Sequence, residues 1–493
     1  MYNKKFKDLI FYEIYPTSFF DSNNDGIGDL KGIEQKLTYI KDLGCNAIWI
    51  NPFYVSPFYD GGYDVKDFYN IDPRFGTMED FETMLKRAHE LNLKIIIDLV
   101  AGHASEENED FLRSAEEVRN EKSDLFIWND CVWHYDMPYR LISGRHQRNA
   151  CFMVNFFAVQ PAFNFGFNNI KNPKWQMSYK DERTFLAREY IINIIRFWLD
   201  KGVDGFRVDM ADSLVKEDDD KTATIEVWKY IFSKIRKDYK DVFFVSEWSN
   251  PKQALEAGFD ADFVLDHWDN FYHRLARSSA FSRGDTILKG APLDFFMNDI
   301  RTRYEDAKEH PGYLALISGN HDTYRLATDL SRKELEVIYF LLYTLPGIPF
   351  LYYGDEIGMK HAPILSKDGG YQRTGDRTPM QWDNTLNYGF STSKDTYLPT
   401  GVNNDVSLEE AIKDSNSIYH YIKKLILLRK EYEDLTSDDF QIEEINRIIT
   451  IRRNNLEIIL NLSNETITID REILFTNGKN HTLNNLEVAL VRK

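Results

Sequence analysis

The 493-residue sequence predicts an α/β fold built on a (β/α)8 barrel, because short apolar segments alternate with amphipathic ones along most of the chain. Continuous β-branched and aromatic runs are typical of parallel strands buried on both faces. Eight such segments end in polar residues: 10–19, 46–53, 94–103, 202–210, 242–248, 262–268, 313–322 and 347–358.

The segments between these strands predict helices. Segment 81–93 places Phe81, Leu85 and Ala88 near one face, and segment 189–202 ends with the stop residue Gly202. Strands separated by helices predict a closed parallel barrel rather than an antiparallel sheet.

Two regions depart from the barrel pattern. The interval from His103 to residue 184 is far longer than a strand–helix loop requires. We therefore predict an inserted domain over 104–172, after the third strand, which divides the barrel into 1–103 and 173–434. Beyond residue 434, short alternating segments separated by Asn and Gly turns predict a small antiparallel β domain over 435–493.

Composition excludes several classes of partner. The chain has 60 basic and 78 acidic residues, so its net charge is −18, which argues against nucleic acid or an anionic membrane as a partner. No apolar run reaches the ~20 residues of a membrane span. The three cysteines (Cys45, Cys131, Cys151) have no disulfide or metal-ligand pattern, and the opening residues lack a secretory signal. We expect a cytoplasmic monomer or homodimer.

Polar side chains gather at the predicted strand ends, where barrel enzymes carry their chemistry. The third, fourth, fifth and seventh strands supply seven of them: Asp98, His103, Arg207, Asp209, Glu247, His321 and Asp322. A single Asp at a strand end is usually structural, but seven polar residues at equivalent positions predict one shared site.

Three converging carboxylates suit glycoside hydrolysis, in which one carboxylate attacks the anomeric carbon and a second donates a proton to the leaving oxygen. Arg207 and Asp209 are two residues apart on one strand, so they share a face, and the guanidinium would keep Asp209 ionised as a nucleophile. Glu247 lies beside an apolar run, where partial desolvation would raise its pKa, and this suits the role of general acid/base. Asp322 would bind sugar hydroxyls and favour the cation-like transition state, and His103 and His321 would donate hydrogen bonds to those hydroxyls.

The chain resembles glycoside hydrolase family 13, the α-amylase superfamily, over essentially its whole length. Four segments match the family's catalytic regions in order: DLVAGH (98–103), GFRVDMADS (205–213), SEW (246–248) and GNHD (319–322). The resemblance implies retaining α-glycoside chemistry, with Asp209 as nucleophile, Glu247 as acid/base and Asp322 as transition-state stabiliser.

Segment 21–30, DSNNDGIGDL, is similar to the metal loop of the oligo-1,6-glucosidase and neopullulanase branches. Asp21, Asn23, Asp25 and Asp29 offer hard oxygens at alternating spacing, and Ile27 offers a backbone carbonyl. This donor set suits Ca²⁺, with Mg²⁺ or a metal-free Asx-rich turn as alternatives. We expect no organic cofactor.

Segment 59–68 resembles the floor of a glucose pocket in this family. By resemblance, Tyr63 would stack on the sugar at subsite −1, and Asp60 would accept a hydrogen bond from its terminal 4-hydroxyl. Arg373 would pair with Asp60 and close the pocket, so that only terminal units are removed. The alternative is that Asp60 and Arg373 form a surface ion pair.

Three departures from the family bear on specificity. Gly102 replaces an Asn that serves a second calcium site, which argues against that site. Asp212-Ser213 stands where amylases carry Lys-His, which argues against efficient cleavage inside starch. The segment QPAFN (160–164) retains Gln160, Pro161 and Asn164 of the α-1,6-acting members. Ala162 and Phe163 differ from those members, so the segment does not fix the linkage.

The leading hypothesis is an exo-acting retaining α-glucosidase for short oligosaccharides. The alternatives are a glucosyl-transferring or isomerising relative such as a trehalose synthase, and an α-amylase or neopullulanase-type hydrolase of maltooligosaccharides. An inactive binding subunit is a third class, but the three catalytic carboxylates argue against it.

Overall fold

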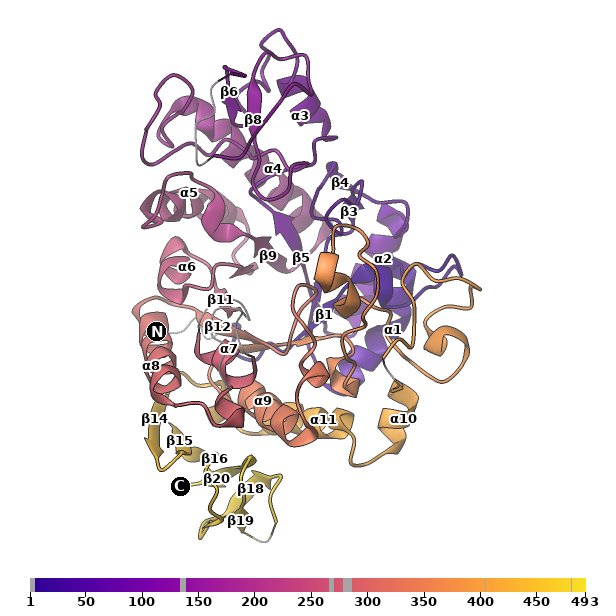
Figure 1. Cartoon of the computed structure of the whole chain (residues 1–493), viewed down its shortest axis with the longest axis vertical. Coiled ribbons are helices and arrows are strands. Elements are labelled where there is room, and N and C mark those ends of the chain that lie inside the picture. The colour runs from indigo at the N-terminus through magenta and orange to yellow at the C-terminus, as the bar shows by residue number, and fades with distance from the viewer. Residues whose placement is uncertain (1–4, 134–138, 266–269, 278–285, 404, 480) are drawn as a thin grey trace.

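A computed structural model describes residues 5–133, 139–265, 270–277, 286–403, 405–479 and 481–493. Eight parallel strands close into a barrel, as the sequence predicts (Figure 1). They are β1 (Phe11–Ile14), β2 (Ala47–Ile50), β5 (Lys94–Val100), β9 (Gly205–Asp209), β10 (Phe243–Ser246), β11 (Ala261–Val264), β12 (Tyr313–Ile317) and β13 (Ile348–Tyr352). The predicted sixth strand extends to residue 268, but residues 266–268 lie outside the described part.

The barrel interior is filled by alternate strand residues. Phe11, Trp49, Phe243 and Phe350 belong to one buried cluster enclosed by the strands, and Phe11 stacks on Phe350 at 4.2 Å. Inward-pointing large side chains make the barrel a packed core. Space for a ligand is therefore expected only at the ends of the strands and in the loops that follow them.

Helices surround the barrel, and many begin at a polar cap. Thr77 and Asp80 form a capping box at the start of α2, and Gly202 ends α4 in the left-handed conformation. The helices are α1 (Leu30–Leu43), α2 (Met78–Glu90), α4 (Phe185–Lys201), α5 (Thr222–Asp238), α6 (Pro251–Ala257), α7 (Phe271–Ala276), α8 (Asp294–Glu309), α9 (Arg332–Thr344), α10 (Leu408–Lys413) and α11 (Ile418–Glu431). None within the described ranges is long and apolar enough to cross a membrane.

Between β5 and α4, the chain forms a small unit on the rim of the barrel (Figure 1, top). It contains α3 (Glu109–Ser114) and an antiparallel sheet of β6 (Trp128–Asn129), β7 (Leu141–Ser143) and β8 (Cys151–Met153). Phe111 packs against Trp128 and Phe152 to form its core. Many of the segment's aromatic residues therefore stabilise the insert itself, but Phe156 lines the cavity described below. A separate two-stranded ribbon, β3 (Tyr54–Val55) with β4 (Asp67–Ile71), lies between β2 and α2.

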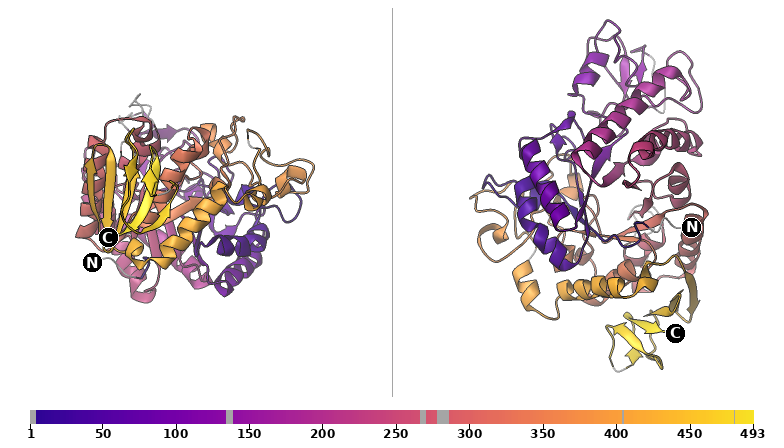
Figure 2. Two further views of the ribbon diagram at one scale, coloured as in Figure 1. Left: turned by 90° about the horizontal axis from the view of Figure 1, so that it is seen from below. Right: turned by 180° about the vertical axis from the view of Figure 1, so that it is seen from behind.

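The last part of the chain forms a separate antiparallel sheet, which lies on the outside of the barrel helices (Figure 2). Its strand β14 packs against α8, and β20 packs against α9. The strands are β14 (Gln441–Ile445), β15 (Ile448–Arg453), β16 (Leu456–Asn461), β18 (Ile473–Thr476) and β20 (Glu487–Arg492), with β17 (Ile467–Thr468) and β19 (Thr482–Leu483) as a small second sheet. None of the described residues of this sheet lines the cavity at the strand ends, and its contacts are with the barrel helices.

Candidate active site

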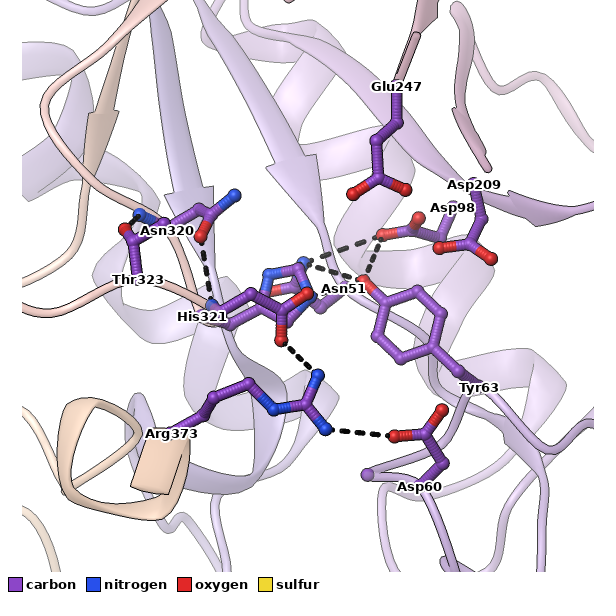
Figure 3. A network of polar contacts seen from close by, with 12 residues as sticks. Asn51, Asp60, Tyr63, Asp98, Asp209, Glu247, Asn320, His321, Thr323 and Arg373 are labelled. Atoms are coloured by element: carbon purple, nitrogen blue, oxygen red, sulfur yellow. Dashed lines mark hydrogen bonds and ion pairs between the residues drawn. The ribbon is translucent and has the colours of Figure 1, made fainter. Parts of the chain in front are cut away.

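A cavity of about 1090 Å³ opens at the carboxyl ends of the barrel strands. Barrel loops and the insert both contribute to its lining, and seven of the predicted site residues lie there: Asp60, Tyr63, His103, Asp209, Glu247, Asp322 and Arg373. Figure 3 shows the side chains of Asp209, Glu247, Tyr63 and Arg373 facing the same space. Asp98, Arg207, Gln160 and His321 lie directly behind this lining, as the contacts below show.

Arg207 is the hub of the carboxylate cluster. It is 1% exposed, and its Nη1 donates to Asp98 Oδ1 at 2.6 Å and to Asp209 Oδ1 at 2.8 Å. Its Nη2 lies 2.8 Å from Glu247 Oε2. Strand register explains this arrangement, because Arg207 on β9 pairs directly with Asp98 on β5. Burial would lower the pKa of Arg207, but the carboxylates outweigh it, so the guanidinium stays charged.

Asp209 lies among charges that affect its ionisation in opposite directions. Burial raises the pKa of Asp209 well above its usual range, and Glu247 and Asp98 raise it further, while Arg207 lowers it. Burial and the neighbouring carboxylates therefore oppose the ionisation of Asp209 that Arg207 is predicted to maintain, because one guanidinium is divided among three carboxylates. Such a cluster takes up a proton as a unit. Retaining glycosidases need one ionised and one protonated carboxyl group.

Glu247 is held at the end of β10 by its neighbours. Its Oε2 accepts a hydrogen bond from the backbone N–H of Met210 at 2.9 Å in addition to the contact with Arg207. Met210 has a positive φ of 42°, an uncommon backbone conformation for a residue of this kind. The strained backbone just after Asp209 thus directs an N–H group at the Glu247 carboxylate, and such strain is often found at functional sites.

Asp322 lies in a different electrostatic environment. Its Oδ1 accepts from Arg373 Nη1 and Arg377 Nη2, both at 2.8 Å, and its Oδ2 lies 3.3 Å from His321 Nε2. Removal from water would raise its pKa, but His321 and the two arginines outweigh this effect and hold the pKa of Asp322 well below its usual range. Asp322 is therefore an anion at neutral pH.

His103 is a neutral member of the site. Burial lowers the pKa of His103 to about 4. Its Nε2 lies 3.0 Å from the carbonyl oxygen of Tyr63, and its Nδ1 lies 3.1 Å from Asn155 Nδ2. Both ring nitrogens therefore contact protein groups, so His103 holds the loop of Tyr63 against the insert.

Three segments of the chain close one part of the cavity wall. Arg373 Nη2 donates to Asp60 Oδ1 at 3.2 Å, and Gln160 Nε2 donates to Asp60 Oδ2 at 2.8 Å. The Asp60 side chain is only 8% exposed, so the contact with Arg373 is not a surface ion pair. Since Arg373 also contacts Asp322, this closure lies beside the predicted transition-state stabiliser.

Three further residues belong to the site but were not predicted from the sequence: Glu13, Asn51 and Arg377. Glu13 Oε1 lies 2.9 Å from His321 Nδ1, and Asn51 Nδ2 lies 3.2 Å from the same oxygen. Arg377 Nε donates to the carbonyl oxygen of His321 at 2.8 Å. Glu13 and Asn51 end the first and second strands, so the strand-end rule that found the other residues could also have found them.

The junction between insert and barrel is organised around Lys216. Its Nζ donates to Asn155 Oδ1 at 2.8 Å and to the carbonyl oxygen of Ser213 at 2.6 Å. A Cβ atom at Gly102 would lie 2.7 Å from Asn155 Nδ2, so a larger residue there would displace Asn155. The Lys216 ammonium group thus satisfies two oxygens at this junction, next to Gly102, where other family members have an Asn that serves a second calcium site. Removal from water lowers the pKa of Lys216 to about 8.

The predicted metal loop satisfies many of its own acceptors. Asp21 accepts from the N–H groups of Asn24 at 2.7 Å and Gly26 at 2.8 Å, and Asp29 caps α1. Asn23 Nδ2 donates to Asp25 Oδ2 at 3.0 Å, and Asp25 Oδ1 accepts from the Ile27 N–H at 2.8 Å. No group of three or more His, Cys, Asp or Glu side chains is placed to hold a metal in the described part of the chain. The oxygen donors suit Ca²⁺ chemically, but their geometry is not that of a preformed acidic cluster.

Comparison with known proteins places this geometry in a family. The α-amylase catalytic domain model matches residues 13–438. The chain belongs to the α-amylase family of glycosidases. This confirms the resemblance inferred from the four catalytic segments and agrees with the barrel and carboxyl-end cavity.

Several differently named members of the α-amylase family are similar to this chain. "Alpha-amylase 3" of Dictyoglomus thermophilum is 32% identical over 94% of this chain and 84% of its own length. The oligo-1,6-glucosidase of Heyndrickxia coagulans is 29% identical over 94% and 93%. The trehalulose synthase MutB of Pseudomonas mesoacidophila shares the fold, with a TM-score of 0.82 and 23% identity over 99% of both chains.

We predict that Lys216→Met lowers the free energy of unfolding by about 2 kcal/mol, because Asn155 Oδ1 and the Ser213 carbonyl lose a buried charged donor. Chemical denaturation measures the change. Lys66→Met is the matched control, since Lys66 forms an exposed ion pair with Glu107 and its loss should change stability by less than ~1 kcal/mol. Equal losses in both variants would contradict the role of Lys216.

Proposed function

We propose that the protein is an exo-acting retaining α-glucosidase that removes glucose from the non-reducing end of short α-glucosides. The observation that carries this proposal is the closure of the cavity by Asp60, Arg373 and Gln160 beside Asp322. A sugar bound with its 4-hydroxyl against Asp60 leaves no room for a further unit on that side.

In the proposed mechanism, Asp209 attacks the anomeric carbon while Glu247 donates a proton to the departing glycosidic oxygen. The carbon–oxygen bond to the leaving sugar breaks as the ester bond to Asp209 forms. Glu247, now ionised, then takes a proton from water, whose oxygen attacks the anomeric carbon and releases Asp209. Contact of both carboxylates with one guanidinium supports these roles, because it keeps them at one sugar ring.

Asp322, anionic at neutral pH, would accept hydrogen bonds from the sugar hydroxyls and stabilise the cation-like transition state. Tyr63 would stack on the sugar, and its ring is already held parallel to His321 at 5.2 Å between centroids. Arg207 would hold Asp209 and Asp98 in place throughout the reaction.

Two alternatives remain in the same family. A relative 30% identical over 88% of this chain is named "Trehalose synthase/amylase TreS" (Mycolicibacterium smegmatis), which supports a transferring or isomerising activity as the second candidate. Transfer replaces water by a sugar hydroxyl in the second step. An endo-acting maltooligosaccharide hydrolase is disfavoured by the closed end of the cavity and by Asp212-Ser213 after the nucleophile.

We further propose that Ca²⁺, with Mg²⁺ as the alternative, binds the 21–29 loop as a structural ion, and that the enzyme works in the cytoplasm as a monomer or homodimer. The oxygen donors of Asp21, Asn23, Asp25 and Ile27 support the ion. The free cysteines support a reducing compartment.

Replacing Asp209 by Asn should abolish turnover of an aryl α-glucoside, with kcat falling at least ~1000-fold, because the amide cannot form the glycosyl ester. Thermal unfolding should be little changed. Asp212→Asn is the matched control on the same cavity wall and should stay within about tenfold of the wild type. Substantial activity in Asp209→Asn would refute the assigned nucleophile.

A substrate panel tests the closed end of the cavity. We expect kcat/KM for maltotriose to exceed that for soluble starch, per accessible chain end, by at least ~10-fold, with glucose as the first product. Maltose, isomaltose, trehalose and sucrose in the same panel define linkage, and new disaccharides at high sugar concentration would favour the transferring alternative. Similar rates on starch and maltotriose would contradict the exo-acting assignment.

Calcium binding predicts a change in stability that does not depend on activity. Saturating Ca²⁺ should raise Tm relative to EDTA by at least about 2 °C, since an ion that binds only the folded state stabilises it. Asp25→Ala should remove the difference between the two conditions, because it deletes a proposed ligand. The same Tm with Ca²⁺, Mg²⁺ and EDTA would mean that the loop folds without a metal.

A further inference from the structure

Glu13 is a buried acid that the proposed mechanism does not use. It lies on β1, is fully buried, and directs Oε1 at His321 Nδ1 over 2.9 Å. Asn51 Nδ2 lies 3.2 Å from the same oxygen. Glu13 thus lies behind His321, on the side away from Asp322.

Both nitrogens of the His321 ring lie within hydrogen-bond distance of an acceptor. Asn51 Nδ2 also lies 3.1 Å from Nδ1, but it donates to the same Glu13 oxygen that Nδ1 faces. Nδ1 faces Glu13, while Nε2 lies 2.8 Å from the Tyr63 hydroxyl and 3.3 Å from Asp322 Oδ2. The Tyr63 hydroxyl can donate to Asp98 Oδ2, which lies at 3.2 Å, and this leaves its oxygen free to accept from His321. A neutral imidazole has only one N–H group, whereas an imidazolium donates from both nitrogens.

We propose that Glu13 is a positioning residue that holds His321 as an imidazolium, so that the ring donates toward Glu13 on one side and toward Tyr63 and Asp322 on the other. This inference rests on the proposed function, because the imidazolium would act on Asp322, the carboxylate proposed to bind the sugar. Glu13 acts through His321 and does not itself touch the cavity, whose lining includes Asp322 but not Glu13.

The surrounding charges are consistent with this state. Burial would lower the pKa of His321, but Asp322 and Glu13 outweigh it and raise the pKa to about 9. Burial raises the pKa of Glu13 above its usual range, although His321, Asn51 and Arg207 each lower it.

Other groups also face the ring. The Trp49 and Tyr15 rings pack on His321 at 5.9 and 6.3 Å, and Arg377 donates to its carbonyl oxygen. Asp98 acts at one remove, through the Tyr63 hydroxyl.

Glu13 also balances the charge of the site. An imidazolium next to a cation-like transition state would be unfavourable if it were not compensated. With Glu13 and Asp322 ionised on its two sides, the group of three carries one net negative charge. Because Glu13 offsets the charge of the imidazolium, the ring can donate two hydrogen bonds without adding net positive charge beside Asp322, which already contacts Arg373 and Arg377.

The test is the pH profile of Glu13→Gln. Glutamine keeps an acceptor oxygen for Nδ1 but removes the charge, so the pKa of His321 should fall. Since the imidazolium exists only below its pKa, the alkaline limb of kcat/KM should move to lower pH by about one unit or more. At pH 6, where His321 is still protonated, kcat/KM should be much less affected.

Glu356→Gln is the matched control. Glu356 is also fully buried, but its partners are the hydroxyls of Tyr12 and Tyr39, at 2.5 and 2.7 Å, and not His321. The alkaline limb of kcat/KM for Glu356→Gln should coincide with that of the wild type. Equal shifts in both variants, or none in Glu13→Gln, would overturn the proposal.

A measurement on the unaltered enzyme covers the case in which Glu13→Gln does not fold. In ¹⁵N-histidine NMR, the His321 signals, assigned by their loss in His321→Gln, should be those of an imidazolium at pH 7.5. Signals of a neutral ring would place the proton on Glu13 and overturn the proposal. If the enzyme proves to transfer rather than hydrolyse glucosyl groups, these signals and the pH shift are unaffected, so the two inferences fail separately.

Discussion

One buried guanidinium supports the carboxylates on which the chemistry of this protein depends. Arg207 contacts Asp98, Asp209 and Glu247 within 2.8 Å, from strands that the barrel brings together. A buried charge is tolerated only when it is paired, and three acids around one base cannot all be ionised without cost. This arrangement fits the proposed retaining mechanism, which needs one acid and one anion.

A second group of charges, around Asp322, complements the first. Here two arginines and His321 surround one carboxylate and keep it ionised, the reverse of the balance at Asp209. Tyr63 links the two groups through its contacts with Asp98 and His321. The insert completes the site by supplying Gln160 to Asp60, and Lys216 connects that insert to the barrel. Substrate length and catalysis thus depend on different segments that meet at one cavity.

The barrel and most of the candidate site could be predicted because the relevant signals are local. Each barrel strand is a continuous apolar run, and Asp209, Glu247 and Asp322 follow such runs directly. Glu13 lies one residue before the end of β1, where a single acid is compatible with burial, capping or a role in a site, so the sequence alone does not assign it. Arg377 has no local signal that distinguishes it from Arg373 in the same segment, and only the fold shows that both contact Asp322.

Local order along the chain is enough to predict strands, helices, the insert and most of the candidate site residues, since each depends on neighbouring residues. Protonation is different, because it depends on the sum of burial and charge from segments far apart. That sum raises the pKa of Asp209, lowers the pKa of Asp322 and raises the pKa of His321, which lies between Glu13 and Asp322. Folding alone brings β1, β5, β9 and β12 together, so these charge states exist only in the closed barrel.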